Sequence, residues 1–231
     1  MTRIAVIGDG KMGRLVAALA PDAGHELVAH VGPEASRAGL TREALGHADV
    51  AIEFTVPSAA PALIRACADL AIPVVSGTTG WEPERPAVER HLDATAGALL
   101  WAPNFSLGVH LFAKVVAEAA KRFAHPAAAF DAHLVETHHA QKLDAPSGTA
   151  KMLAGAAAKA GGRAMPITSI RTGAVPGTHE VVLDAAFEQV RLVHEARDRR
   201  VFAAGALAAA RWILGRRGIF TLDDLFGEAP R

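Results

Sequence analysis

Cysteine is almost absent from this chain, and neither sign of charge is in excess. The 231 residues include one cysteine, Cys67, which lies in an apolar segment. An intrachain disulfide is therefore excluded, and we assign this thiol to core packing rather than to a nucleophilic role. Lys plus Arg and Asp plus Glu each total 24, so the formal net charge is zero. We therefore expect neither a nucleic-acid partner nor attraction to a membrane.

Long uninterrupted hydrophobic runs are also missing. The apolar run at residues 3–7 is too short for a signal peptide and leads directly into a glycine turn. The longest uncharged stretch, residues 94–113, is interrupted by Gly97, Pro103 and Asn104. We interpret it as a buried strand, a loop and the start of a helix rather than as a membrane helix. Together with the lone cysteine, this pattern favours a cytoplasmic protein.

The first hundred residues alternate between short apolar runs and helix-like segments. Strands are predicted at residues 3–7, 25–31, 48–55, 72–76 and 98–102, with helices at residues 12–20 and 58–69. Continuous apolar strands separated by helices imply a parallel sheet that is covered on both faces. We therefore predict an α/β domain with a doubly wound parallel sheet of the Rossmann type.

The pattern changes in the second half of the chain. A helix is predicted at residues 109–123, a strand at 130–137, a helix from Pro146 to about residue 159, and strands at 167–171, 179–185 and 189–195. Three successive strands without intervening helices suggest a mixed or antiparallel sheet, and so a smaller α+β domain. A last helix at residues 199–214 is expected to pack back on the first domain.

Residues 8–13 read Gly-Asp-Gly-Lys-Met-Gly, which is the pattern G-x-G-x-x-G between the first predicted strand and helix. In this pattern Gly8 permits the tight turn, Gly10 lets the backbone approach a pyrophosphate, and Gly13 lets the helix pack closely on the strand. The helix N-terminus offers free N–H groups and a positive dipole end to the phosphates. This placement favours dinucleotide binding over a merely structural turn.

An acidic residue usually ends the second strand of such a unit, where it binds the ribose 2′-hydroxyl of NAD. This chain has Ala-His-Val-Gly-Pro at residues 29–33, and Glu34 and Arg37 follow. The expected cofactor is therefore NADH or NADPH, with the preference left open.

Two later turns, residues 77–80 and 102–105, follow the fourth and fifth predicted strands. Small and hydroxyl side chains at these strand ends suit the close approach of a nicotinamide and its ribose. A purely structural role in forming the turns is an equal alternative. The candidate cofactor-binding residues are Gly8, Asp9, Gly10, Lys11, Met12, Gly13, Gly77, Thr78, Thr79, Ala102, Pro103, Asn104 and Phe105.

The densest polar cluster spans residues 136–150, which read E-T-H-H-A-Q-K-L-D-A-P-S-G-T-A. Pro146 suits the first turn of a helix, and residues 147–149 present free N–H groups and hydroxyls. Such a helix start is an anion site that suits a carboxylate. Lys142 adds a positive charge, and a histidine beside it could deliver a proton near neutral pH.

Paired histidines can also bind a metal, and His133 lies nearby in the sequence. However, no cysteine and no H-x-x-x-H or H-E-x-x-H spacing supports a metal site, so none is expected. Arg171 and His179 lie beyond the glycine pair at residues 161–162, where they either support the site or serve a structural role.

The same fifteen-residue segment resembles the signature of the dihydrodipicolinate reductases, E-x-H-H-x-x-K-x-D-A-P-S-G-T-A, and matches every fixed position. The glycine turn and the segments at residues 77–80, 102–105 and 170–173 follow in family order. The resemblance therefore extends over nearly the whole chain.

The resemblance implies a nucleotide-binding domain at residues 1–104, completed by residues 200–231, and a substrate-binding and tetramerisation domain at residues 105–199. It implies reduction of 4-hydroxy-tetrahydrodipicolinate, a small dicarboxylate, to tetrahydrodipicolinate in diaminopimelate and lysine biosynthesis. Hydride would come from C4 of the nicotinamide.

By position, His138 is similar to the family's proton donor and Lys142 to its catalytic lysine. His139, Gly148 and Thr149 fall, together with Lys142, where the family holds the substrate carboxylates. A homotetramer is implied as well.

This sequence departs from the family pattern in a glycine turn that is one residue shorter and in the missing acid after the second strand. Two alternatives compete with the resemblance: another two-domain dehydrogenase, and a non-catalytic dinucleotide sensor. A sensor has no need of His138 and Lys142 beside an anion site. A semialdehyde dehydrogenase requires a nucleophilic cysteine, and Cys67 is badly placed for one.

Overall fold

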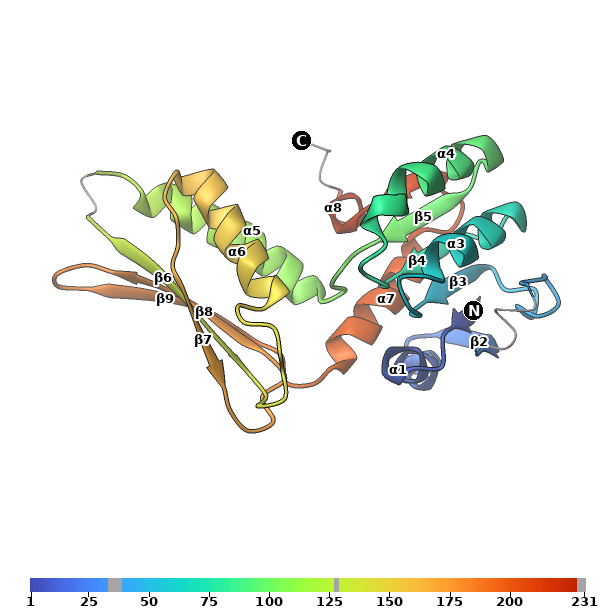
Figure 1. Cartoon of the computed structure of the whole chain (residues 1–231), viewed down its shortest axis with the longest axis horizontal. Coiled ribbons are helices and arrows are strands. Elements are labelled where there is room, and N and C mark those ends of the chain that lie inside the picture. Colours follow the sequence, from blue (N-terminus) through green and yellow to red (C-terminus); the bar gives the residue numbers. More distant parts are fainter. Residues whose placement is uncertain (33–38, 127–128, 228–231) are drawn as a thin grey trace. The chain divides into compact units, whose positions relative to one another are not determined.

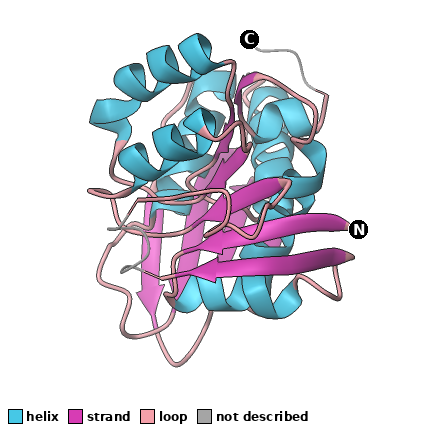
Figure 2. Ribbon diagram, turned by 90° about the vertical axis from the view of Figure 1, so that its right-hand side faces the viewer, coloured by secondary structure: helices cyan, strands magenta, loops and turns pink. Residues whose placement is uncertain are grey.

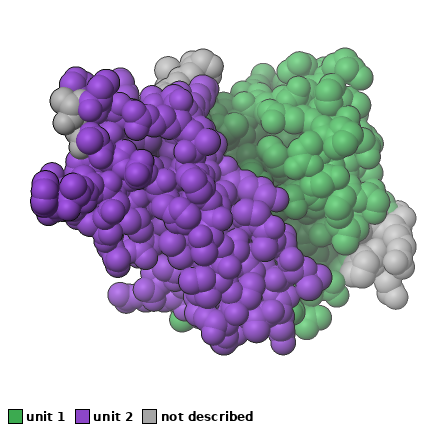
Figure 3. Space-filling view, turned by 60° about the vertical axis from the view of Figure 1, so that its left-hand side comes forward, with its two compact units in different colours: residues 1–105, 200–231 green, residues 106–199 purple. Residues whose placement is uncertain are grey.

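The computed structural model describes residues 1–32, 39–126 and 129–227, so Glu34 and Arg37 lie outside the described residues. The chain forms two compact units, which Figure 3 colours separately. Unit 1 comprises Met1–Phe105 with Arg200–Arg231, and unit 2 comprises Ser106–Arg199. No helix among the described residues has the length and apolar character needed to cross a membrane.

Unit 1 contains a six-stranded sheet in the order β10-β5-β4-β3-β1-β2, in which all neighbouring strands are parallel (Figure 1). Its strands are β1 (Thr2–Ile7), β2 (His25–Val31), β3 (Val50–Glu53), β4 (Val74–Ser76), β5 (Ala98–Trp101) and β10 (Gly218–Phe220). Every residue of β3 and β4 is buried, as expected for central strands covered on both faces.

Helices cover both faces of this sheet (Figures 1 and 2). Helix α1 packs against α7 on one face, and α3 packs against α4 on the other. The helices of unit 1 are α1 (Lys11–Leu19), α3 (Ala60–Asp69), the short 3-10 helix η1 (Glu82–Glu84), α4 (Arg85–Thr95), α7 (Arg200–Trp212) and α8 (Leu222–Leu225). The predicted doubly wound α/β fold is therefore confirmed.

Unit 2 contains a four-stranded mixed sheet in the order β7-β6-β8-β9, with two helices that pack on each other. Strands β6 and β7 are parallel, whereas β8 is antiparallel to both β6 and β9. The elements are α5 (Leu107–Phe123), β6 (Asp131–His138), α6 (Gly148–Gly161), β7 (Ile167–Arg171), β8 (Thr178–Asp184) and β9 (Gln189–Glu195).

One face of this second sheet carries α5 and α6 (Figure 1). Alternate residues such as Leu134 and Val181 join the core under these helices. The residues in between face the other way, and among them Ile170 on β7 and Val193 on β9 are 42% and 55% exposed. Within the described ranges, no element of unit 2 covers this second face.

Some elements differ from the sequence prediction. Helix α4, β10 and α8 were not predicted, because their segments are short or polar and gain their stability from packing on the rest of unit 1. Pro146 does not begin α6 as predicted. Ser147 is the N-cap, and its Oγ accepts a hydrogen bond from the backbone N–H of Ala150 at 3.1 Å.

The glycine turn depends on a close approach between its own ends. A Cβ on Gly13 would lie 1.8 Å from the carbonyl oxygen of Gly8, whereas a Cβ on Gly10 would meet no atom of the described residues within 4 Å. Gly13 therefore has a packing role, while the backbone at Gly10 faces open space.

We expect Gly13→Ala to lower the free energy of unfolding by roughly 2 kcal/mol, because the added methyl group forces the first turn of α1 away from the strand. Urea unfolding measures this change. Gly10→Ala is the matched control and is expected to unfold at nearly the wild-type urea concentration. Equal stability of the two variants would contradict the close approach at Gly13.

Candidate active site

A cleft lies at the carboxyl edge of the parallel sheet in unit 1. The chain passes from β1 to β2 on one side and returns to β3 on the other, so the sheet has its switch point between β1 and β3. Ligands of doubly wound sheets bind at such a point. A cavity of about 500 Å³ opens there, between the glycine turn at residues 8–10 and the loop at residues 54–59.

The glycine turn provides a phosphate cradle in this cleft. Helix α1 begins at Lys11 with no side-chain cap, which leaves its first N–H groups without a side-chain acceptor. The space in front of Gly10 is open, and Asp9, Gly10 and Lys11 are exposed. These features fit the pyrophosphate of a dinucleotide.

The buried carboxylate of Glu53 connects the loops after β3 and β4. Glu53 ends β3 and is 0% exposed. Its oxygens accept hydrogen bonds from the hydroxyls of Ser76 and Thr78, both at 2.6 Å, and from the backbone N–H of Thr55 at 2.8 Å. One side chain therefore fixes two neighbouring loops at the edge of the sheet.

Two predicted cofactor residues have internal contacts. The Thr78 hydroxyl contacts Glu53. The backbone carbonyl oxygen of Thr78 accepts hydrogen bonds from the indole N–H of Trp81 at 2.8 Å and of Trp101 at 2.9 Å. Phe105 is 2% exposed, and its ring lies edge-on to that of Phe54. The side chains of Thr78 and Phe105 therefore hold the loops in shape, and a ligand would contact these two residues mainly through their backbone.

The other predicted cofactor residues outside the glycine turn are neighbours of Thr78 or Phe105 in the sequence. Thr79 and Pro103 are exposed, Gly77 and Asn104 are half-buried, and Ala102 is buried. A Cβ on Gly77 would lie 2.0 Å from the ring of Phe54, so only glycine fits beside that ring.

In unit 2, the buried carboxylate of Glu136 organises the polar cluster. Glu136 and His138 are two residues apart on β6 and therefore point to the same face of the sheet. One Glu136 oxygen accepts a hydrogen bond from Nδ1 of His138. The other accepts from Nη2 of Arg171 at 2.7 Å and from the backbone N–H of Ser147 at 3.3 Å.

This network sets the protonation of its members. Burial alone would raise the pKa of Glu136, but hydrogen bonds from Arg171, Ser169 and His138 lower it to about 2. Burial lowers the pKa of His138, although the hydrogen bond and negative charge of Glu136 oppose that effect. Burial also lowers the pKa of His179, to about 4, and the charge of His138 adds to this.

The tautomer of His138 follows from the same contact. Because Nδ1 donates to Glu136, the second ring nitrogen is the one that can exchange a proton with a ligand. That nitrogen lies 3.0 Å from where a Cβ of Gly177 would stand. A side chain at residue 177 would therefore crowd the reactive edge of the imidazole.

Two of the predicted substrate-binding residues, Gly148 and Thr149, are the first residues of α6. Gly148 is exposed, and a Cβ there would meet nothing within 4 Å. His139 and Thr149 are half-buried. The ammonium of Lys142 forms an ion pair with Asp144 at 2.7 Å, which lowers the pKa of that carboxyl group.

Glu136, His138 and His179 also offer metal-ligand atoms within 4.8 Å of one another. However, the carboxylate of Glu136 is already shared between Arg171 and His138. A divalent cation would have to displace these contacts, and the guanidinium would repel it. The arrangement suits a proton donor better than a metal ligand set.

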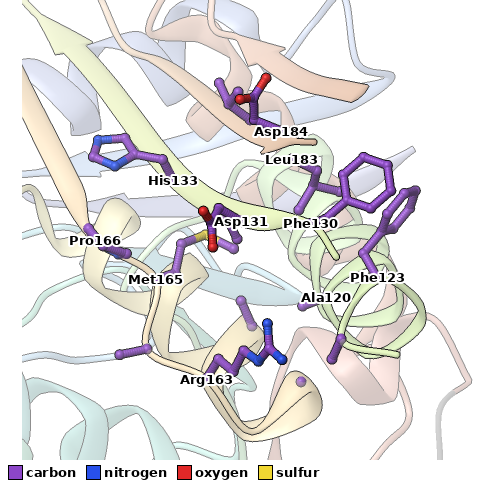
Figure 4. Close-up of a pocket in the computed structure, with 16 residues that line it drawn as sticks. Ala120, Phe123, Phe130, Asp131, His133, Arg163, Met165, Pro166, Leu183 and Asp184 are labelled. Carbon is purple, nitrogen blue, oxygen red and sulfur yellow. The ribbon is translucent and has the colours of Figure 1, made fainter. Parts of the chain in front are cut away.

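A second cavity, of about 390 Å³, lies in unit 2, and Figure 4 shows the residues that line it. It is lined by apolar side chains, including Phe123, Phe130 and Met165, with Asp131 and Asp184 among them. The lining comes from the ends of α5 and α6, the segment after α6, the start of β6 and the end of β8. Asp131 and Asp184 pair at the end of the sheet away from His138. None of the site residues predicted from the sequence lines this cavity.

Two protein-family models match the chain. The N-terminal model of dihydrodipicolinate reductase covers residues 2–105, and the C-terminal model covers residues 108–226. The chain belongs to the dihydrodipicolinate reductase family. The resemblance in residues 136–150 is thereby confirmed, and the chain is an oxidoreductase of this family.

Individual members of the dihydrodipicolinate reductase family match along their full length. The 4-hydroxy-tetrahydrodipicolinate reductase of Christiangramia forsetii is 33% identical, over 97% of this chain and 98% of its own. That of Alkalilimnicola ehrlichii is 36% identical, over 98% and 99%. The solved structure of dipicolinate-bound dihydrodipicolinate reductase from Paenisporosarcina sp. TG-14 has a TM-score of 0.80 at 23% identity, covering 96% of this chain and 97% of that one, which shows the shared fold.

Some residues of the reductase site were not assigned a role from the sequence. Glu136 belongs to the recognised segment, and its spacing to His138 could have indicated their contact. Arg171 and His179 come into the site through strand pairing, since β7 aligns Arg171 with His138 and β8 aligns His179 with Glu136. That register is not visible in the sequence.

Glu136 should make the stability of the reductase depend on pH. Its pKa is lower in the folded protein than in the unfolded chain, so its contribution is complete above about pH 4.5 and is lost as the pH falls toward 2. We expect Glu136→Gln to lower the free energy of unfolding at pH 7 by about 3 kcal/mol and to remove that part of the acid dependence. Urea unfolding from pH 3 to pH 7 checks both effects.

The matched control is Glu118→Gln, which breaks an exposed ion pair with Arg122 on α5. We expect it to leave stability nearly unchanged, because exposed pairs contribute little. A similar small effect for Glu136→Gln would contradict the central role of this carboxylate.

Proposed function

We propose that this chain reduces 4-hydroxy-tetrahydrodipicolinate to tetrahydrodipicolinate with NADH or NADPH, in diaminopimelate and lysine biosynthesis. One observation carries the proposal: a buried histidine, held by a carboxylate, lies beside a helix start that suits a carboxylate ligand. In this proposal the histidine is the proton donor and the helix start is the anion site, as reduction of a dicarboxylate requires. The family names of the full-length relatives support the same reaction.

The proton is supplied by His138. A bound reduced nicotinamide would supply the hydride to one carbon, and the neighbouring carbon receives the proton. Glu136 holds the His138 ring in one tautomer and stabilises its charged form, so that the other nitrogen faces the substrate. By its position in the shared segment, His138 resembles the proton donor of the family.

The substrate carboxylates bind around the first turn of α6. The backbone of Gly148 and Thr149, the ammonium of Lys142 and the ring of His139 form this anion site. On binding, a substrate carboxylate competes with Asp144 for Lys142. In the described part of the chain, Nε of Arg171 and Nδ1 of His179 are buried without a hydrogen-bond partner, which supports a polar ligand here.

The two units divide the work. Unit 1 binds the dinucleotide through its glycine turn and the loops after β4 and β5, and unit 2 binds the substrate. The fit of the open turn at Gly10 to a pyrophosphate supports the first assignment. We assign the protein to the cytoplasm, with a small dicarboxylate as its partner.

We also propose a homotetramer that assembles through the second face of the unit 2 sheet. Ile170 and Val193 expose apolar surface there, on a sheet whose other face forms the core under α5 and α6. Exposed apolar strands of this kind are stabilised by association.

The reaction is tested by a coupled assay with purified protein. Dihydrodipicolinate synthase generates the substrate from pyruvate and aspartate semialdehyde, and loss of reduced nicotinamide is followed with NADH and NADPH separately. We expect turnover with at least one of the two. If neither NADH nor NADPH is consumed by a protein that still binds a dinucleotide, the proposed reaction is refuted, and another dehydrogenase or a sensor is favoured.

His138→Gln and Lys142→Ala separate the two roles in the same assay. We expect His138→Gln to lower kcat about 10²-fold with unchanged dinucleotide affinity, because it removes the proton donor. Lys142→Ala is expected to raise KM for the substrate as well as to lower kcat. A near-normal kcat for His138→Gln would refute its role, and an effect of Lys142→Ala on dinucleotide binding alone would place that lysine elsewhere.

The assembly is tested by light scattering after size exclusion. We expect Ile170→Asp to shift the tetramer to smaller species, because the charge would be buried in the contact. Val115→Asp is the control, since Val115 is similarly exposed, at 51%, on α5. Dissociation of the control but not of Ile170→Asp would place the interface on the helical face.

A further inference from the structure

We propose that Asp9 selects NADH over NADPH, because its carboxylate takes the place of the acidic residue that β2 lacks. This inference rests on the proposed dinucleotide-dependent reduction, and it names the cofactor of that same cleft. The acid of most NAD-binding units comes from the end of the second strand, whereas here it would come from the glycine turn.

The end of β2 offers no acidic side chain. Strand β2 stops at Val31, and Gly32 follows with no side chain. The preceding residues, Ala29 and His30, are not acidic either. The place from which an NAD-binding carboxylate would usually project is therefore vacant on the strand itself.

The carboxylate of Asp9 lies beside this place. A Cβ built on Gly32 would have Oδ2 of Asp9 at 3.7 Å and its Cγ at 3.9 Å. Among the described residues, no other heavy atom outside its chain neighbours comes within 4 Å of that point. The Asp9 carboxylate therefore lies within 4 Å of the point from which a side chain of residue 32 would project.

Two hydrogen bonds keep the turn at this position. The backbone N–H of Gly8 donates to the carbonyl of Val31 at 2.9 Å, and Nε2 of His30 donates to the carbonyl of Gly8 at 3.0 Å. Because both bonds join the turn to the last residues of β2, the distance between Asp9 and Gly32 is set by the fold rather than by a mobile loop.

The Asp9 carboxylate is also available to a ligand. Asp9 is exposed and lines the 500 Å³ cleft with Gly8 and Gly10. Across residues 1–32, 39–126 and 129–227, no hydrogen bond or ion pair occupies its oxygens. A carboxylate in this position accepts hydrogen bonds from an adenosine ribose 2′-hydroxyl, whereas it repels a 2′-phosphate.

The test measures equilibrium binding of NADH and of NADPH to the purified protein by calorimetry, without substrate. We expect the wild type to bind NADH about tenfold more tightly than NADPH, or ~1.4 kcal/mol. In Asp9→Asn we expect the NADPH dissociation constant to fall about tenfold, because the repulsion is gone. The NADH constant should change little, because the amide oxygen still accepts a hydrogen bond.

Asp22→Asn, an exposed carboxylate in the turn after α1, is the matched control for net charge and should leave the ratio of the two constants unchanged. Raising the salt concentration should reduce the wild-type preference but not that of Asp9→Asn, because an exposed charge is screened. The kcat with saturating NADH should stay near wild type in Asp22→Asn.

The inference is overturned if the wild type binds NADPH as tightly as NADH, or if Asp9→Asn leaves the ratio unchanged. It is also overturned if Glu34→Gln, outside the described residues, produces the shift in place of Asp9→Asn. Each of these results leaves the proposed reaction standing. If neither dinucleotide binds the wild type, the proposed cofactor site and this inference both fail.

Discussion

The carboxylate of Glu136 has no access to solvent, and the polar groups of unit 2 converge on it. It joins the last residue of β6, the last residue of β7 and the N-cap of α6 through His138, Arg171 and Ser147. A buried charge is tolerated only when it is paired and hydrogen-bonded, so each partner is held where the carboxylate requires. The proton donor and the anion site are thereby built from one interaction.

Unit 1 uses a similar device with different partners. Glu53 is as deeply buried as Glu136, but hydroxyl and backbone donors surround it instead of a guanidinium and an imidazole. Its partners are the last residue of β4 and the loops after β3 and β4, at the edge where parallel sheets bind their ligands. In both units, then, a buried carboxylate near the end of a central strand organises residues at the ends of neighbouring strands or just beyond them.

Much of the fold and part of the candidate site could be predicted from local sequence patterns. The glycine turn depends on three positions within six residues, and the presence of a helix start near residues 146–149 on a few adjacent residues. The bounds of β2, β7 and β9 coincide with the predicted ones, because their apolar or alternating patterns are strong. Helix α4 and strand β10 could not be predicted, because packing rather than a local pattern decides their structure. The predicted helix start at Pro146 was wrong, because Pro146 precedes the N-cap instead of entering the helix.

By itself, the sequence determined the doubly wound first domain, the mixed second sheet, the glycine turn and the segment that identifies the family, since these are encoded by residues close together in the chain. Only the tertiary structure decided which residues complete the sites. Arg171 and His179 reach Glu136 through strand register, and Asp9 reaches the end of β2 because β1 and β2 pair side by side in parallel. Such contacts join residues far apart in the sequence, and their geometry exists only once the sheets have formed.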